Sequence, residues 1–184
     1  MALTYTPDPE IGKPCPDFTL PATDGKTYSR SDFAGSDAFL VMFICNHCPY
    51  VQAIQDRLVE LGRHFEGKSV KIAAISSNDA DEHPEDSFPK MKELAEAKRF
   101  PFPYLYDESQ QVAKTFGAVC TPDFFLYDRS MMLTYRGRLD DSWKDPKAVR
   151  TQELKNAIEA LLAGRKPSAD QTPSMGCNIK WKKA

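Results

Sequence analysis

The stretch that decides the fold is residues 38–65, which read AFLVMFICNHCPYVQAIQDRLVELGRHF. Its first part, Ala38 to Ile44, is short, apolar and rich in strand-forming side chains, as expected of a central strand covered on both faces. From Pro49 the apolar residues recur at three- and four-residue spacing, which predicts a helix. A C-x-x-C pair, Cys45 and Cys48, stands at the junction. The sequence therefore places two thiols where a buried strand gives way to a helix.

The rest of the chain alternates strand and helix patterns around this unit. In chain order we expect a hairpin of 18–20 with 27–29, a strand at 70–76, helices at 87–99 and 109–116, a hairpin of 123–127 with 133–139, and a helix at 151–163. This order predicts an α/β fold, with a mixed central β-sheet flanked by helices, an N-terminal β-hairpin and an extended C-terminal tail. Because the composition shifts from Gly164 onward, we expect one domain over residues 1–164 and a tail over 165–184.

The composition excludes several classes of protein. The 184 residues carry 24 Lys and Arg against 26 Asp and Glu, a net charge of −2, so there is no basic surplus for nucleic acid. The longest apolar run, residues 38–45, is eight residues, whereas a membrane helix needs about 20. Residues 1–12 contain no Lys or Arg and no apolar segment, so we expect no secretory signal and a cytoplasmic location.

Cys45, Cys48 and His47 are the candidate catalytic residues. A thiolate at a helix N-terminus is stabilised by unpaired backbone N–H groups and by the helix dipole, and Cys45 is expected to benefit from both. His47 would add positive charge or a hydrogen bond that lowers the pKa of Cys45 further. Two residues between the cysteines at a helix start bring the sulfurs within disulfide range, so Cys48 can resolve a mixed disulfide formed by Cys45.

Zinc binding is another use for these side chains. The soft ligands that the chain offers are Cys45, His47, Cys48, Cys120 and Cys177. No second C-x-x-C or H-x-x-H at a recognised spacing accompanies them. We therefore predict no metal and no cofactor, and keep a zinc-binding or redox-sensing module without turnover as an alternative.

Two further cysteines are candidates for an auxiliary role. Cys120 precedes Thr121-Pro122 at the head of a predicted strand, and it is either a third thiol near the redox pair or a packed core cysteine. Cys177 follows Gly176 in the tail, and it either reaches back as a resolving thiol or lies in a packed strap.

Charged side chains elsewhere offer weaker candidates. Arg136 and Arg138 alternate along one face of a predicted strand. Either both line the site, where they would stabilise a thiolate or a peroxide oxygen, or they face solvent. The acidic run at residues 79–86 has the composition of a solvated connection, and His83 within it shows no ligand spacing.

Several of these segments together resemble a known family. They are FLVMFI followed by CNHCPY, then CTPDFFLYD at 120–128, RGRLDD at 136–141, and the opening IGKPCPDFTLPATDG at 11–25. The chain resembles the thioredoxin-like superfamily, in its thiol-specific antioxidant and alkyl hydroperoxide reductase, or peroxiredoxin-like, branch. The resemblance covers residues 11–164, and the tail segment PSMGCNIKWK resembles that of an uncharacterised peroxiredoxin-like subgroup.

The resemblance implies a thioredoxin fold and a set of roles. Cys45 would be the attacking thiol, Cys48 the resolving thiol, and Pro122 a cis-proline facing the disulfide. Thr121 would contact substrate, because in such proteins the backbone beside that proline pairs with the extended substrate chain. The expected activity is that of a thiol–disulfide oxidoreductase acting on protein or small-molecule disulfides and thiols.

A peroxiredoxin-like thiol peroxidase that reduces hydroperoxides through Cys45 is the main alternative. Typical peroxiredoxins carry a proline and a threonine seven and three residues ahead of the peroxidatic cysteine, and here those positions hold Ala38 and Met42. The sequence therefore favours disulfide exchange over the standard peroxidase site.

Overall fold

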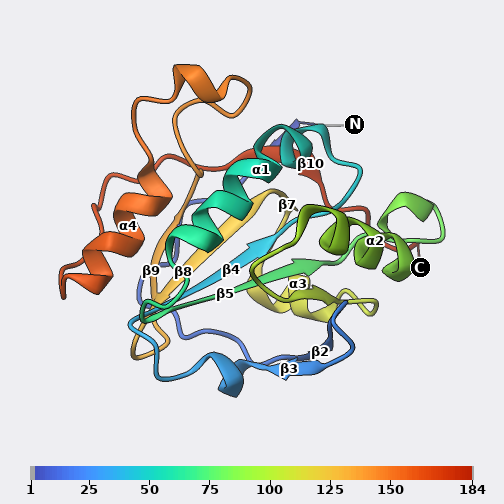
Figure 1. Ribbon diagram of the computed structural model, residues 1–184, viewed down its shortest axis with the longest axis horizontal. Helices are drawn as coiled ribbons and strands as arrows, with labels where there is room; N and C mark the ends of the chain where they lie inside the picture. Colours follow the sequence, from blue (N-terminus) through green and yellow to red (C-terminus); the bar gives the residue numbers. More distant parts are fainter. Residues whose placement is uncertain (1–2, 184) are drawn as a thin grey trace.

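The computed structural model describes residues 3–183, and a five-stranded mixed sheet lies at its centre (Figure 1). The strand order is β6-β5-β4-β8-β9, with β4 parallel to β5 and antiparallel to β8. The strands are β4 (Ala38–Phe43), β5 (Val70–Ser76), β6 (Tyr104–Tyr106), β8 (Asp123–Asp128) and β9 (Leu133–Gly137). The predicted α/β fold with a mixed central sheet is confirmed.

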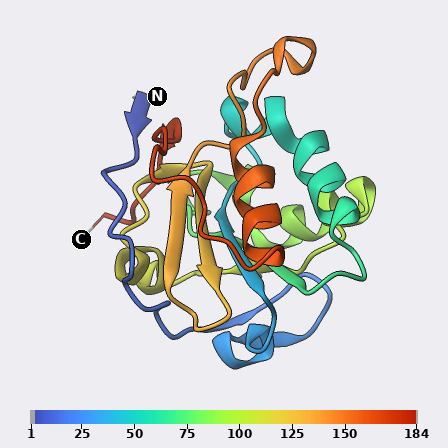
Figure 2. The ribbon, with the colours of Figure 1, turned by 90° about the vertical axis from the view of Figure 1, so that its left-hand side faces the viewer.

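Helices cover both faces of this sheet. One face carries α1 (Pro49–His64), α2 (Phe88–Lys98) and α4 (Glu153–Leu162), whereas α3 (Gln111–Phe116) lies on the other with the hairpin of β2 (Thr19–Pro21) and β3 (Thr27–Ser29) (Figures 1 and 2). Single 3-10 turns occur at Arg30–Phe33 (η1), Pro84–Asp86 (η2) and Pro146–Ala148 (η3). Each helix and hairpin lies within a few residues of its predicted position.

The central strand β4 is buried on both faces of the sheet, and this burial fixes the position of the residues that follow it. Its side chains alternate between two apolar cores, with Leu40 and Met42 facing α1 and α4, and Phe39 and Phe43 facing α3 and the hairpin. All six residues of β4 are buried. Each fully buried large apolar side chain contributes about 1.5–3 kcal/mol. The strand therefore holds its carboxyl end, where Cys45 follows, in a fixed position.

A second, three-stranded sheet joins both ends of the described chain, and the sequence analysis did not predict it. Its order is β1-β10-β7, formed by β1 (Leu3–Tyr5), β10 (Met175–Asn178) and β7 (Cys120–Thr121). Both pairings are antiparallel, and β10 lies in the middle. The four residues of β10 include a glycine and are too few to show a strand pattern. Part of the predicted tail thus packs into the fold, and a domain boundary at residue 164 stays a prediction.

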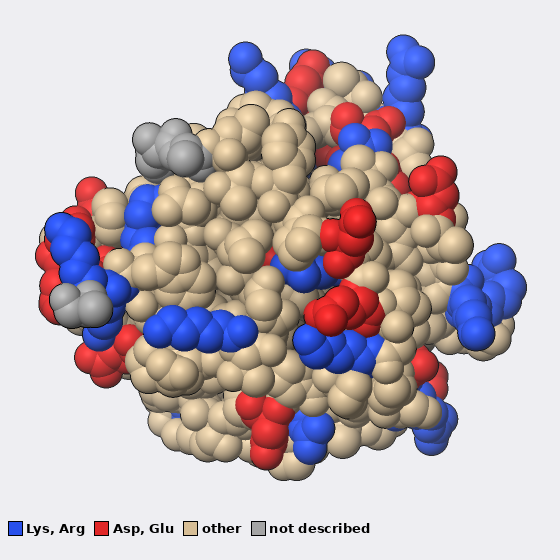
Figure 3. Space-filling model, turned by 180° about the vertical axis from the view of Figure 1, so that it is seen from behind, with Lys and Arg blue, Asp and Glu red and all other residues tan. Residues whose placement is uncertain are grey.

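The surface carries charges of both signs in close mixture. On the face seen in Figure 3, Lys and Arg side chains lie near Asp and Glu, with wide uncharged areas between them. Exposed ion pairs such as Lys98 with Asp56 and Arg129 with Asp37 bring opposite charges together. Among residues 3–183, no helix has both the length and the apolar character needed to cross a bilayer.

Candidate active site

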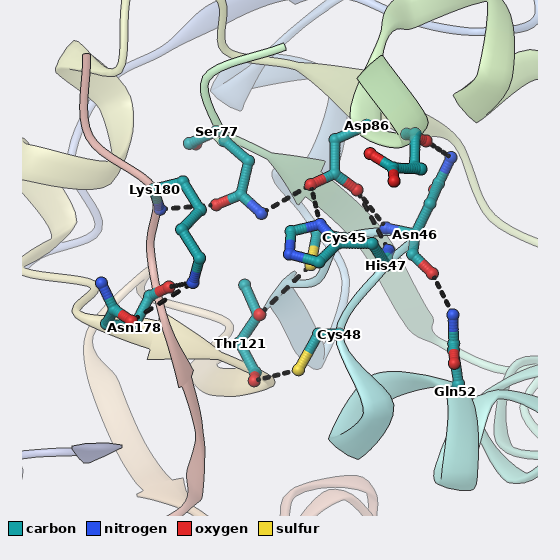
Figure 4. Close-up of polar contacts among 12 residues, drawn as sticks. Cys45, Asn46, His47, Cys48, Gln52, Ser77, Asp86, Thr121, Asn178 and Lys180 are labelled. Atoms are coloured by element: carbon teal, nitrogen blue, oxygen red, sulfur yellow. Dashed lines mark hydrogen bonds and ion pairs between the residues drawn. The ribbon is translucent and has the colours of Figure 1, made fainter. Parts of the chain in front are cut away.

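The two cysteines of the C-x-x-C lie against Thr121 at the carboxyl end of β4 (Figure 4). Cys45 Sγ is 3.4 Å from Thr121 Oγ1, and Cys48 Sγ is 3.2 Å from the carbonyl oxygen of Thr121. The Thr121–Pro122 peptide bond is cis, as the resemblance implies. Both cysteines are buried, with 1% and 0% exposure. The fold therefore assembles the two thiols and the proline segment from distant parts of the chain.

The His47 ring contacts the Asp86 carboxylate. His47 Nδ1 lies 2.5 Å from Asp86 Oδ2, and that carboxylate also accepts from the side-chain amide of Asn78 at 2.7 Å. Its other oxygen accepts the backbone N–H groups of Asn46 at 2.8 Å and of His47 at 3.1 Å (Figure 4). The prediction that residues 79–86 form a solvated connection is wrong at Asp86, which is fully buried. This carboxylate holds the two residues between the cysteines.

The electrostatic effect on Cys45 is opposite to the predicted one. The contact with Cys48, burial and the negative charge of Asp86 together raise the pKa of Cys45 well above its ordinary value. From the sequence, we expect His47 to lower the pKa of Cys45. That prediction is wrong because the imidazole faces Asp86, and because α1 starts at Pro49 with Cys48 as its N-cap, so the helix N-terminus lies beside Cys48.

Cys48 is the better stabilised thiolate. The thiol of Cys45 donates to it, the thiol of Cys177 donates as well, and the backbone N–H groups of Val51 and Cys177 add to them. These contacts outweigh burial and lower the pKa of Cys48 to about 5. As a neutral thiol, Cys48 would instead donate to the Thr121 carbonyl oxygen. Four donors around one sulfur outweigh that single acceptor, so we assign the negative charge to Cys48.

The two auxiliary cysteines have different surroundings. Cys177 is paired with Thr121 in the β10–β7 ladder, and its thiol contacts Cys48. Cys120 is fully buried, and its sulfur faces the carbonyl oxygen of Pro122 at 3.8 Å. Burial raises the pKa of the Cys120 thiol strongly, which keeps it neutral. Of the two, Cys177 joins the redox pair and Cys120 is a packed core residue.

The two arginines of β9 and its extension do not contact the thiols. Arg136 is buried and forms a two-pronged ion pair with Asp123, with the shorter contact at 2.8 Å, so the expectation of a solvated face is wrong at this position. Arg138 is partly exposed and pairs with Glu153 at 2.6 Å. Its predicted role at the thiols has no supporting contact in the described structure.

A cavity of about 270 Å³ lies beside Pro122. Arg138 and the aromatic pair Tyr50 and Trp143, whose ring centroids are 4.4 Å apart, are among the side chains that line it. The sequence analysis missed this cavity, because Trp143 follows β9 in an irregular segment that carries no periodic signal. The cavity is large enough for a side chain of a substrate next to the cis-proline.

One group of side chains could hold a metal ion. The ligand atoms of Cys45, His47 and Asp86 lie within 4.8 Å of one another, and they are types that zinc accepts. His83, whose position in the chain gave no signal, stacks on His47 with ring centroids 4.8 Å apart. A metal would have to compete with the hydrogen bonds that Asp86 already accepts from His47 and Asn78.

Comparison with known proteins agrees with this geometry. The model of the family described as AhpC/TSA matches residues 11–136. The chain belongs to the AhpC/TSA family. A structure of an uncharacterized conserved protein from Geobacillus kaustophilus is 43% identical with a TM-score of 0.95, and the match covers 100% of this chain and 98% of that one.

The curated relatives of this chain include two kinds of enzyme. The thiol-disulfide oxidoreductase ResA of Bacillus thuringiensis subsp. konkukian (strain 97-27) is 28% identical over 65% of each chain. The chloroplastic peroxiredoxin Q of Triticum aestivum is 29% identical over 55% of this chain and 43% of its own length. The chain thus spans about two thirds or less of the length of these relatives. It is a member of the AhpC/TSA family with a thioredoxin-like fold.

Proposed function

We propose that the protein is a thiol–disulfide oxidoreductase that cycles between a Cys45–Cys48 disulfide and the dithiol. The observation that carries this proposal is the mutual contact of the two thiols at the start of α1, with both sulfurs against Thr121. Disulfide exchange needs two sulfurs that can close to about 2.05 Å and a thiolate to begin the reaction. The site supports both requirements.

The arrangement gives each thiol a part in the cycle. In the reduced site the Cys45 thiol donates to the Cys48 thiolate. When the Cys45 sulfur attacks a substrate disulfide, its proton passes to Cys48, and the leaving substrate sulfur departs as a thiolate and then takes up a proton. After Cys48 loses its proton again, it attacks the mixed disulfide, which forms the Cys45–Cys48 bond and releases the second substrate thiol.

The substrates proposed are protein or small-molecule disulfides and thiols. Thr121 and Pro122 would contact them, and the cavity beside Pro122 supports that role. The main-chain edge of Thr121 is taken by β10 in this structure, so an extended chain needs that strand to move before it can pair there. A cytoplasmic location stays a prediction.

The test is turnover with two substrates of different size, insulin and bis(2-hydroxyethyl) disulfide, with dithiothreitol as reductant. Cys45→Ser and Cys48→Ser should abolish catalysis, and Cys15→Ser should not, because Cys15 lies in the core on the opposite face of the sheet. Peptide mapping of the oxidised protein should find a Cys45–Cys48 bond. Retained turnover in Cys45→Ser would overturn the proposal.

A thiol peroxidase is the second candidate, which the peroxiredoxins among the relatives favour. Peroxide attack requires a thiolate at Cys45, as disulfide attack does, so in either reaction Cys45 first passes its proton to Cys48. Hydrogen peroxide consumption with dithiothreitol that disappears in Cys45→Ser would support the peroxidase. Stoichiometric zinc in the purified reduced protein, without turnover of either kind, would support a zinc-binding module at Cys45, His47 and Asp86.

A further inference from the structure

The C-terminal strand β10 lies directly beside the redox pair. Cys177 is paired with Thr121, the residue whose side chain and carbonyl group contact Cys45 and Cys48. The neighbouring Gly176 packs closely against the backbone of Thr121. A Cβ atom added to Gly176 would lie 1.9 Å from the Thr121 carbonyl oxygen. No other residue type fits this position unless β10 shifts. The backbone therefore places the Cys177 side chain at the site.

The tail is held on both sides of this strand. Upstream, the Ser174 hydroxyl donates to the Pro122 carbonyl oxygen at 2.8 Å. Downstream, the Asn78 side chain accepts the backbone N–H of Lys180 at 2.9 Å and donates to Asp86, and Asp86 in turn accepts the backbone N–H groups of Asn46 and His47 between the cysteines. Cys177 itself is 2% exposed. Packing in the folded core therefore fixes the Cys177 side chain beside Cys45 and Cys48.

Cys48 is the sulfur that both other thiols contact. Its side chain interacts with Cys45 and with Cys177, and all three belong to one apolar cluster. Burial, together with the contact to Cys48, raises the pKa of the Cys177 thiol to about 12, so Cys177 is the proton donor of that contact. A sulfur with two thiol neighbours can form a disulfide with either of them.

We propose that Cys177 is a third redox thiol of this site, which exchanges with the Cys45–Cys48 disulfide to form a Cys48–Cys177 disulfide. This proposal rests on the oxidoreductase function proposed above and adds an internal partner for its disulfide. The strand that carries Cys177 occupies the main-chain edge of Thr121, where an extended chain could otherwise add to the sheet. The tail therefore reacts in the position of a substrate chain.

The exchange balances without an outside oxidant. Cys177 loses its proton and its sulfur attacks the Cys48 sulfur of the Cys45–Cys48 disulfide. The Cys48–Cys177 bond forms as the Cys45–Cys48 bond breaks, and Cys45 leaves as a thiolate that takes up the proton released by Cys177. The product keeps one disulfide and one thiol, now at Cys45, with β10 covalently fixed to α1.

The decisive experiment traps the second disulfide. The full-length Cys45→Ser variant is oxidised with diamide, which takes two electrons and two protons from a pair of thiols, and is mapped by peptide mass spectrometry. We expect a Cys48–Cys177 bond in most of the protein. The Cys45→Ser/Cys177→Ser variant should lose this species, and the matched Cys45→Ser/Cys120→Ser variant should keep it. An unoxidised Cys48, or a bond from Cys48 to Cys120, would overturn the proposal.

A second variant separates placement from chemistry. Gly176→Ala in the Cys45→Ser background keeps the other four thiols but forces β10 away from Thr121. The yield of the Cys48–Cys177 bond should therefore fall at least tenfold. Far-UV circular dichroism should stay that of the folded protein. An unchanged yield would overturn the geometric argument. If wild-type protein turns over disulfides but Cys45→Ser forms no Cys48–Cys177 bond, the third thiol fails and the proposed function stands. If the bond forms but wild type shows no turnover, the proposed function fails.

Discussion

Replacement of Asp86 by alanine tests how the loop between the two cysteines is held. The carboxylate is fully buried and accepts hydrogen bonds from two backbone N–H groups, from the His47 ring and from the Asn78 amide. Asp86→Ala leaves all four donors without their acceptor. Because all four donors point at the Asp86 carboxylate, these contacts offer them no second acceptor that could replace its oxygens.

The expected loss of stability in Asp86→Ala follows from these four hydrogen bonds. A buried donor without a partner costs about 1–3 kcal/mol. The backbone of Asn46 and His47 lies at the rim of the site, in residues of intermediate burial, so water can satisfy part of the need. We therefore expect a loss of about 3–5 kcal/mol in the free energy of unfolding, which is the sum over the four donors reduced for those that water can reach. For a chain of this size, that corresponds to a fall in Tm of about 6–20 °C.

The assay is thermal and urea unfolding of the reduced protein, followed by far-UV circular dichroism. Glu85→Ala is the matched control, because its side chain is exposed and only its backbone carbonyl contacts Asn46. Asp86→Asn should give an intermediate loss, since one oxygen stays to accept the backbone donors. Alkylation of Cys45 near neutral pH should also become faster, because the Asp86 charge, which adds to the Cys48 contact and burial in raising the pKa of Cys45, is gone. A loss below about 1 kcal/mol in Asp86→Ala, the ordinary mutational average, would refute the reasoning.

Two further predictions concern charge in the core. The pKa of Cys48 is lowered from 9.0 to about 5 by folding, so this thiol contributes stability that is complete above pH 9 and is lost as the pH falls toward 5. The unfolding free energy of reduced wild type, measured in urea relative to Cys48→Ser, should therefore rise between pH 5 and pH 9, and a pH-independent difference would contradict the assignment of the thiolate. Arg136→Met should lower the free energy of unfolding by about 3–5 kcal/mol, because it leaves Asp123 buried without its partner. The Asp123→Leu/Arg136→Met double variant should recover part of that loss in urea unfolding, and no recovery would show that the pair itself stabilises the fold.

The fold was largely predictable because its elements carry local signals. Residues 38–43 form β4 and Pro49–His64 form α1, as the apolar run and the three- and four-residue spacing predict. The hairpin of β8 and β9 also lies where its alternating pattern placed it. The three-stranded sheet was missed because its strands have two to four residues, too few for any periodicity to show.

The features of the site also divide into those that the local sequence determines and those that the tertiary structure determines. The sequence by itself determined that two thiols two residues apart stand at a strand–helix junction, because strand and helix formation and the C-x-x-C spacing are properties of neighbouring residues. Tertiary structure decided which charge acts on them. Asp86 reaches His47 across 39 residues, and its charge adds to the Cys48 contact and the burial that raise the pKa of Cys45, opposite to the predicted effect. Tertiary structure also decided that Cys177 and not Cys120 contacts Cys48, because that choice depends on the pairing of β10 with Thr121. Pairing between distant segments is set by packing and hydrogen bonding in three dimensions, and no local pattern encodes it.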